Sequence, residues 1–272
     1  MLNLASDILN DVENAVKQPR FYRRHLGASL IGKSCARSVW YSFRWATRKK
    51  LPANIIRLLA RGDRAESVFE SALKAAGFEL YTHNKYTGEQ FGFEEFGGHL
   101  GGSIDGVINL NPHFDAWALL EFKTHNQKSF NELKKGVKSS KPAHYAQMQM
   151  YMGKMNLGYA LYCAINKNDD KFYFEIVDFS KEYFNRYMMR AELVLDSNKP
   201  LDRISNKKSW HECKICDHFK VCHEQGEMVK SCRTCKFSKS DKLSGEWVCG
   251  KHNKNLTKND QIAYCSDFSE IK

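Results

Sequence analysis

The chain has 272 residues, and its 42 lysines and arginines outnumber 31 acidic residues to give a formal net charge of +11. A chain of this length can bury one full core and carry a small appendage. No apolar run approaches the ~20 residues of a membrane helix, and the acidic N-terminus MLNLASDILNDVENAV lacks the basic start of a secretory signal. The composition therefore predicts a globular cytoplasmic protein with a polyanionic partner such as DNA.

Helices and a β-hairpin are predicted in the first half of the chain. Residues 1–53 read as helical with basic and aromatic character, and Pro52 ends that segment. Residues 54–76 place apolar side chains at helical spacing and stop at Gly77. Residues 91–124 are glycine-rich and β-like, and the pair Asn111-Pro112 predicts a turn between two strands.

The second half of the chain alternates helices and strands. A polar, lysine-rich connector follows the hairpin, and a helix is expected over about residues 142–156. Residues 158–165 and 171–179 predict two strands, and a helix is expected over about residues 181–196. Pro200 opens a linker to a cysteine-rich tail. This order predicts an α/β domain with a mixed central sheet flanked by helices.

The predicted hairpin carries a candidate metal site. Asp105 stands where an apolar strand breaks into Asp-Gly, and Glu121 and Lys123 are two residues apart in a strand, so their side chains leave the same face. Phe122 points the opposite way, with its carbonyl close to an ion held by Glu121. Taken singly, these residues read as a turn and a solvated strand face. Together they favour a site for a hard divalent cation and metal-assisted phosphodiester hydrolysis.

The pattern of Asp105, then Glu121-x-Lys123, then Gln147-x-x-x-Tyr151 resembles the PD-(D/E)XK nuclease superfamily. The last element is typical of its RecB-like branch, which includes phage exonucleases and the iron–sulfur nucleases of CRISPR adaptation. The resemblance spans about residues 30–225 and implies a restriction-endonuclease-like core that uses Mg²⁺ or Mn²⁺. It implies that Asp105, Glu121 and the Phe122 carbonyl bind the metal, while Lys123 assists the nucleophile.

The same resemblance assigns roles to two helices. The stretch from Gly62 to Glu66 matches a helix of this branch and implies that Glu66 is an additional metal carboxylate. Glu70 lies on the same helix face, which leaves a surface ion pair as the alternative for this region. Gln147 and Tyr151, one helical turn apart, are expected to face the site and to contact substrate or support Lys123.

Basic residues form three runs along the chain. A single run usually marks solvated surface, but three runs flanking a candidate phosphodiesterase site favour a track for nucleic acid. The residues are Arg20, Arg23, Arg24, Arg44, Arg48, Lys49, Lys50, Lys128, Lys134, Lys135, Lys138 and Lys141.

Nine cysteines in a basic, cytoplasmic chain favour metal binding over disulfides. Cys213, Cys216 and Cys222 are three ligands without a fourth in their own segment. The family resemblance implies that Cys35 completes a 4Fe–4S cluster that staples the two segments together. Two alternatives stay open: Cys35 as a buried apolar residue, and a zinc ion with a local fourth ligand from His211, His218 or His223.

The tail carries a second cysteine set. The spacing Cys232-x2-Cys235-x13-Cys249-x15-Cys265 predicts a Cys₄ zinc site on a short β-ribbon. The tail has too few large apolar residues for a core of its own, so bound metal is expected to supply much of its folding free energy. Cys163 is left over and is predicted to lie in the core.

The leading hypothesis is a Mg²⁺- or Mn²⁺-dependent deoxyribonuclease, with a nuclease domain in residues 1–225 and a zinc-ribbon-like module in residues 226–272. By resemblance it is an exonuclease of phage recombination or replication type, acting in a bacterial host cell, with a phage single-strand annealing protein as a candidate partner. The alternatives are an endonuclease of the same fold, a catalytically silent metal-stapled DNA-binding adaptor, and a nuclease whose cluster senses oxidation. No helicase-type phosphate loop occurs, so unwinding would need another protein.

Overall fold

A mixed five-stranded sheet forms the centre of the computed structural model, which describes residues 2–16, 18, 22–48 and 50–272. Its strand order is β2-β5-β6-β7-β8. The pairs β5–β6 and β7–β8 are antiparallel and the pair β6–β7 is parallel, which confirms the predicted mixed α/β sheet. The strands are β2 (Leu80–Tyr81), β5 (Gly106–Asn109), β6 (Trp117–His125), β7 (Tyr159–Asn166) and β8 (Phe172–Asp178).

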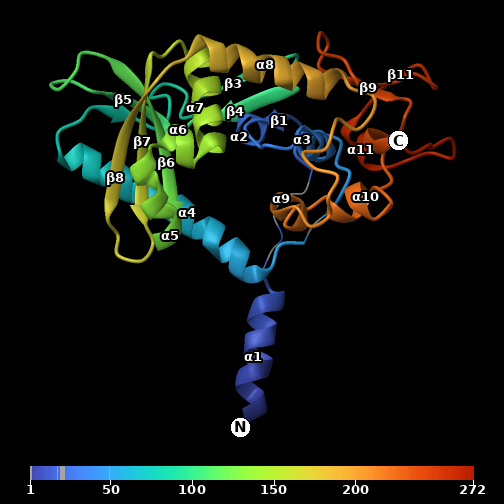
Figure 1. The fold of residues 1–272 in the computed structure, drawn as a ribbon, viewed down its shortest axis with the longest axis horizontal. Helices are drawn as coiled ribbons and strands as arrows, with labels where there is room; N and C mark the ends of the chain where they lie inside the picture. Colours follow the sequence, from blue (N-terminus) through green and yellow to red (C-terminus); the bar gives the residue numbers. More distant parts are fainter. Residues whose placement is uncertain (1, 17, 19–21, 49) are drawn as a thin grey trace.

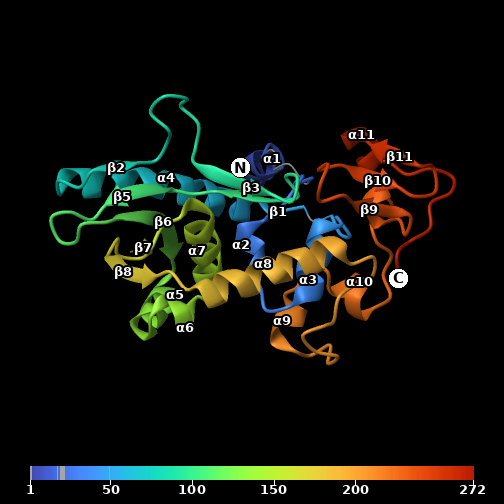
Figure 2. The same cartoon turned by 90° about the horizontal axis from the view of Figure 1, so that it is seen from above.

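A helical crossover joins the two parallel strands β6 and β7, as parallel pairing requires. Its main element is α7 (Pro142–Met155), where the sequence predicted a helix. The connector before it, predicted only as polar, folds into three short helical pieces: α5 (Gln127–Asn131), η1 (Glu132–Lys135) and α6 (Val137–Ser140). Figures 1 and 2 show these pieces beside the sheet, with α7 leading back to β7.

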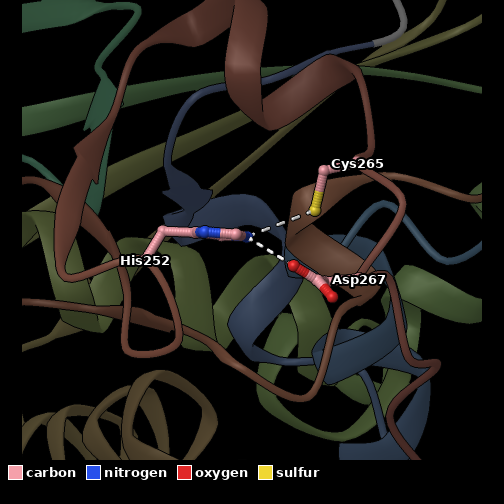
Figure 3. A group of neighbouring side chains, drawn as sticks. All are labelled: His252, Cys265 and Asp267. Atoms are coloured by element: carbon pink, nitrogen blue, oxygen red, sulfur yellow. Dashed lines mark hydrogen bonds and ion pairs between the residues drawn. The ribbon is translucent and has the colours of Figure 1, made fainter.

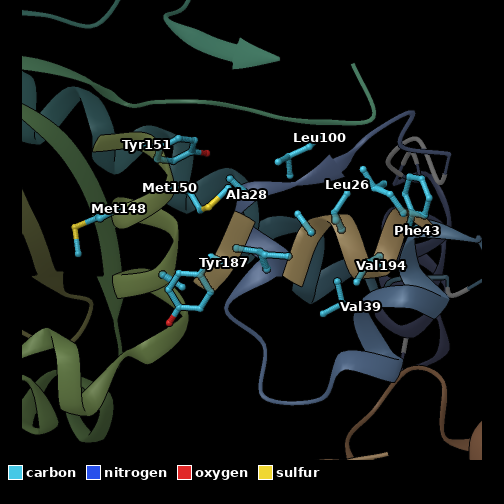
Figure 4. Close-up of a cluster of buried hydrophobic side chains, with 14 of the residues drawn as sticks. Leu26, Ala28, Val39, Phe43, Leu100, Met148, Met150, Tyr151, Tyr187 and Val194 are labelled. Carbon is cyan, nitrogen blue, oxygen red and sulfur yellow. The ribbon is translucent and has the colours of Figure 1, made fainter. Parts of the chain in front are cut away.

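Both faces of the sheet are buried, because alternate residues of its central strands enter two different apolar clusters. Leu119 and Tyr162 pack with α7 in the first cluster, part of which is drawn in Figure 4. Leu120 and Phe122 pack in the second cluster with Phe69 of α4 (Ala53–Ala75). Cys163 lies fully buried in this second cluster, as predicted.

The first 53 residues are less helical than predicted. The described part of this segment contains α1 (Leu2–Asn14), α2 (Ala28–Ile31) and α3 (Ala36–Phe43), together with β1 (Leu26–Gly27). Two features explain the difference. Strand β1 pairs in parallel with β4 (Leu100–Ser103) instead of continuing a helix. Gly32 ends α2 and packs so closely on α7 that a Cβ added to it would lie 2.5 Å from the Cβ of Ala146. Strand β3 (Gly92–Glu95) completes this second, three-stranded sheet.

The other predicted elements are confirmed. The helix predicted over residues 54–76 is α4, and Gly77 follows it with a positive φ of 88°. Asn111-Pro112 lies in the connection between β5 and β6. The last predicted helix is α8 (Lys181–Asp196), which packs against α7 and α3. No helix among the described residues is long and apolar enough to cross a membrane.

The cysteine-rich tail packs on the N-terminal helices. It contains α9 (His211–Lys214), α10 (Phe219–His223), η2 (Cys232–Thr234), β9 (Ser238–Ser240), β10 (Trp247–Cys249), β11 (Lys254–Leu256) and α11 (Lys258–Ile262). Strands β9, β10 and β11 form an antiparallel sheet, so the predicted β-ribbon has three strands. The ring of Trp247 lies 5.2 Å from that of Phe43, and both residues belong to the first apolar cluster.

Two buried arginines fasten this tail to the N-terminal helices. Arg44 is fully buried, donates to the carbonyls of Ser238 and Ser197, and lies 4.9 Å from the Trp247 ring. Arg233 donates to the carbonyls of Phe43 and Arg24 and lies 4.3 Å from the same ring. The prediction that Arg44 belongs to a nucleic-acid track is therefore wrong, because carbonyls and indole rings enclose its guanidinium. Arg20 and Lys49 lie outside the described residues.

Candidate functional site

The predicted hairpin residues meet at the end of β6 that faces α4. Asp105 lies between β4 and β5, and its Oδ2 accepts a 2.7 Å hydrogen bond from the backbone N–H of Phe122. Lys123 forms an ion pair with Glu121, lies 4.0 Å from Asp105 Oδ2, and donates to the Phe122 carbonyl at 2.9 Å. Two carboxylates, one carbonyl and one ammonium group therefore share a single site, as the spacing predicted.

The carboxylate of Glu121 is fully buried, and within the described chain only the ammonium group of Lys123 pairs with it. Burial raises the pKa of Glu121 to about 7, although Lys123 opposes this shift; the nearby Asp105 carboxylate adds to it. For Lys123, burial alone would lower the pKa, but the carboxylates of Glu121 and Asp105 raise it overall. Buried carboxylate oxygens without hydrogen-bond donors suit a cation ligand. This all-oxygen donor set fits a hard divalent ion.

Helix α4 adds Glu66 to the site, and Glu70 does not belong to it. Glu66 lines one cavity together with Lys123. Its partial burial raises its pKa, and the Asp105 carboxylate adds to that shift. Glu70 instead forms an ion pair of 2.6 Å with Lys74, one turn further along the same helix. Stacking of the Phe69 and Phe122 rings, with centroids 5.0 Å apart and an interplanar angle of 8°, holds α4 against β6.

Helix α7 presents Gln147 and Tyr151 to the same region. The Gln147 Nε2 atom lies 3.5 Å from the Tyr151 hydroxyl, and the Tyr151 ring is buried. Burial and the carboxylates of Glu121 and Asp105 raise the pKa of Tyr151. The tyrosine packs on β4 at Gly102, where an added Cβ would come within 2.8 Å of its hydroxyl. Since β4 leads directly to Asp105, this contact fixes α7 relative to the carboxylates.

Two histidines beside the site were not predicted from the sequence. His125 Nε2 lies 2.8 Å from the Tyr162 hydroxyl, and His144 Nδ1 lies 2.9 Å from the same oxygen. Burial, with help from Lys123 and Lys141, lowers the pKa of His125 to about 4 and that of His144 to about 3, so both rings are neutral at pH 7. A signal was present, because His144 is three residues before Gln147 and lies on the same helix face.

A cavity of about 480 Å³ opens beside these groups between α4, the end of β6 and the start of α7. Acidic and basic side chains line it together: Glu66, Lys123, His125, Lys141, His144 and Lys167. The carboxylates that line it, Asp63 and Glu66, are of a type that suits a metal ion, and the lysines suit a phosphate group. The cavity can therefore receive a phosphodiester next to a bound cation.

The first cysteine set is brought together from both ends of the chain. Cys35, Cys213, Cys216 and Cys222 all line one cavity of about 840 Å³. Burial raises the pKa of Cys213, and repulsion from the other three thiolates raises it further. Thiols are the donors that a thiophilic metal or a cluster takes, but no three of these sulfurs lie within 4.8 Å of one another, so the ligand set stays a prediction.

Of the histidines considered as a zinc ligand for this set, His218 is already engaged through both ring nitrogens. They lie 3.0 Å from Ser42 Oγ and 2.8 Å from Thr47 Oγ1. His223 lines the cavity with a buried Nε2 that has no hydrogen-bond partner among the described residues. His211 is mostly exposed and lies next to Glu212.

The second cysteine set also converges. A cavity of about 360 Å³ in the tail is lined by Cys232, Cys235, Cys249 and Cys265. Burial raises the pKa of Cys232 to about 11, and the other three cysteines add to that shift. The four thiols of the predicted set therefore share one cavity, although no three of their sulfurs lie within 4.8 Å of one another, and zinc binding by this set stays a prediction.

Comparisons with known proteins complete the description of the site. The sequence matches no protein-family model and no curated protein. Among solved structures, SSO0001 is similar over 82% of this chain and 96% of its own, with 18% identity and a TM-score of 0.43. LHK-Exo in complex with dAMP is similar over 63% of this chain and 86% of its own, with 16% identity and a TM-score of 0.44. The alkaline exonuclease LHK-Exo from Laribacter hongkongensis gives the same coverage, 15% identity and a TM-score of 0.43. Likenesses of this size do not establish function, which is argued below from the residues.

Proposed function

We propose that this chain is a divalent-metal-dependent deoxyribonuclease that hydrolyses phosphodiester bonds. The observation that supports it is that Asp105, Glu121 and Lys123 lie together on β6 and its neighbouring turn, and that Lys123 also lines a cavity with Glu66, Lys141 and Lys167. Burying the Glu121 carboxylate with only a lysine ammonium group as its partner among the described residues costs folding free energy. Buried charges of this kind occur at functional sites, so this glutamate favours a functional role for the site.

Each residue has a distinct task in this proposal. Asp105, Glu121, Glu66 and the Phe122 carbonyl hold Mg²⁺ or Mn²⁺, which when bound activates water and stabilises charge on the scissile phosphate. Lys123, held beside both hairpin carboxylates, orients the attacking water and faces the developing negative charge. Gln147 and Tyr151 position Lys123 or contact the substrate strand.

The polarity of the cavity favours a nucleic acid as substrate. Lys141 and Lys167 line it together with Glu66, and the neutral rings of His125 and His144 add hydrogen-bonding groups without further charge. Further details of the proposal come from the resemblance of the motif to the RecB-like branch. They are the preference for DNA, exonuclease action, a phage recombination or replication context in a bacterial cytoplasm, and an annealing protein as partner.

The two cysteine sets are proposed as structural metal sites. Cys35, Cys213, Cys216 and Cys222 hold a 4Fe–4S cluster or zinc, and the tail thiols hold zinc. Burial raises the pKa of the Cys222 thiol, and the nearby guanidinium groups of Arg203 and Arg37 oppose that shift. In both sets the metal would link segments of the chain, and the cavity of the first set shares Lys141 and His144 with the cavity of the proposed cleavage site.

The test uses the full chain with its cysteine sites loaded. Linear duplex DNA, covalently closed circular duplex and a single-stranded oligonucleotide are incubated with Mg²⁺ or without it. Magnesium is omitted rather than chelated, because a strong chelator would also strip the thiolate sites. Asp105→Ala serves as the inactive control and Glu70→Ala, which removes an exposed helix ion pair, as the matched active control.

Each outcome of this test is decisive. Magnesium-dependent loss of the linear or single-stranded substrate, with the circle intact, supports an exonuclease. Cutting of the circle supports an endonuclease of the same fold. Salt-sensitive binding without cleavage of any substrate overturns the proposal in favour of the silent DNA-binding adaptor.

A further inference from the structure

The tail contains a donor that the cysteine pattern did not reveal. Cys232 and Cys235 are separated by two residues, and the same separation joins Cys249 to His252. In the second turn the backbone N–H of His252 points at Cys249 Sγ, with 3.5 Å between nitrogen and sulfur. The two turns are therefore alike in spacing, with a histidine in place of the second cysteine.

His252 and Cys265 lie together at the mouth of the tail cavity. Figure 3 shows the imidazole of His252 directed at the thiol of Cys265, and Nε2 lies 3.6 Å from Sγ. Both residues are exposed, whereas Cys235 and Cys249 are buried at the base of the cavity. Counting Cys232, five cysteine and histidine donors line one cavity, together with Asp260 and Asp267, which pair with Lys254 and Lys251.

A structural zinc site takes four ligands in tetrahedral geometry, so five donors are one too many. We propose that the tail binds one zinc ion through Cys232, Cys235 and Cys249, and that His252 and Cys265 compete for the fourth position. The inference concerns metal binding alone and does not depend on the proposed nuclease activity.

The surrounding charges agree with a site of this kind. Lys254 lines the cavity beside the thiols, and Lys251 pairs with Asp267, which lines it too. Asp267 lies 3.3 Å from His252 Nε2, and His252, Cys265 and Asp267 have donor atoms within 4.8 Å of one another. Asp267 also pairs with Lys251 at 2.7 Å, and its hard carboxylate oxygen suits a thiophilic metal less well than imidazole or thiolate, so the proposal leaves it outside the four ligands. Thiolate and imidazole donors select zinc over the hard ions Mg²⁺ and Ca²⁺.

The competition is tested by cobalt substitution of the tail site in the full chain. Co²⁺ reports each thiolate ligand through its sulfur-to-metal charge-transfer absorption. The first cysteine set is unchanged in every variant, so it adds the same absorption to each spectrum and differences between spectra report the tail site. The variants are Cys265→Ala, His252→Ala, the double variant, and Cys249→Ala as the reference for loss of a fixed ligand. Cadmium NMR of the unsubstituted chain counts the thiolates at the tail site without any substitution.

The proposal predicts that each single variant at the mouth keeps stoichiometric tail metal. The double variant and Cys249→Ala should each lose about 100-fold in affinity, the share of one ligand in a four-ligand site. Cadmium NMR should show both an all-thiolate and a three-thiolate form. If Cys265→Ala alone weakens binding as much as Cys249→Ala, His252 is no ligand and the proposal fails. It fails equally if His252→Ala alone does so, or if the chain takes up no tail metal.

Discussion

Replacing Glu121 by glutamine is expected to stabilise the metal-free protein at alkaline pH. Burial raises the pKa of this carboxyl from 4.5 to about 7. Between these two values the folded protein binds a proton that the unfolded chain does not bind, so the free energy of unfolding falls as pH rises. At about 1.4 kcal/mol per pKa unit, the loss across this window is about 3 kcal/mol. Glutamine fills the same space and cannot ionise, so Glu121→Gln avoids this loss.

Urea unfolding at pH 5 and at pH 8 measures the effect, in buffer without Mg²⁺ or Mn²⁺ and with the cysteine sites loaded. The variant should equal the wild type at pH 5 and exceed it by about 3 kcal/mol at pH 8. Glu70→Gln is the matched control, because that carboxylate is partly exposed and its pairing with Lys74 is worth only about 0.5 kcal/mol. Adding Mg²⁺ at pH 8 should stabilise the wild type and not Glu121→Gln.

Parallel pH profiles for the wild type and Glu121→Gln would refute this reasoning. They would show that the buried carboxylate carries no electrostatic cost in the folded state. The argument that its charge is retained for metal binding would then lose its physical basis.

Three further predictions concern the site and the tail. Asp105→Asn should slow Mg²⁺-dependent cleavage at least ~100-fold in single-turnover assays, because loss of a metal ligand removes several kcal/mol of charge stabilisation in the transition state. An unchanged rate would exclude Asp105 as a metal ligand. Burial lowers the pKa of His125 from 6.5 to about 4, so between pH 6.5 and pH 4 the unfolded chain binds a proton that the folded chain does not. The free energy of unfolding therefore falls with falling pH, by up to about 3 kcal/mol. His125→Asn should flatten this part of the acid-unfolding profile, and an unaltered profile would contradict the lowered pKa of His125. Arg233→Ala should lower the free energy of unfolding, measured by urea denaturation, by about 3 kcal/mol or more, because the carbonyls of Phe43 and Arg24 lose a charged hydrogen-bond donor. A loss below about 1 kcal/mol would show that water takes the place of the guanidinium group.

The parts of the fold that depend on local pattern were predictable from the sequence. Alternation and apolar runs located β6, β7 and β8, and helical periodicity located α4, α7 and α8. The convergence of Asp105, Glu121 and Lys123 followed from a strand-end turn and a spacing of two residues. Their roles as metal ligands and nucleophile assistant remain predictions.

The parts that depend on long-range packing were not predictable. Arg44 reads as a surface cation, and its burial becomes visible only when Trp247 and the carbonyls of Ser238 and Ser197 surround it. The contact of His125 with Tyr162 requires the register of β6 against β7, which no local pattern specifies. In the first 53 residues, pairing with β4 and packing of Gly32 against α7 overrode helical propensity.

The most direct measurement of the central claim compares Lys123→Ala with Lys74→Ala on linear duplex DNA. Both lysines pair with a glutamate, but only Lys123 lies beside the proposed metal carboxylates. Single-turnover cleavage with Mg²⁺ and salt-dependent binding are measured on the same preparations. The account predicts that Lys123→Ala binds DNA and cleaves it at least ~100-fold more slowly, while Lys74→Ala cleaves like the wild type. Equal cleavage by both variants would contradict the assignment of this site as a nuclease active centre.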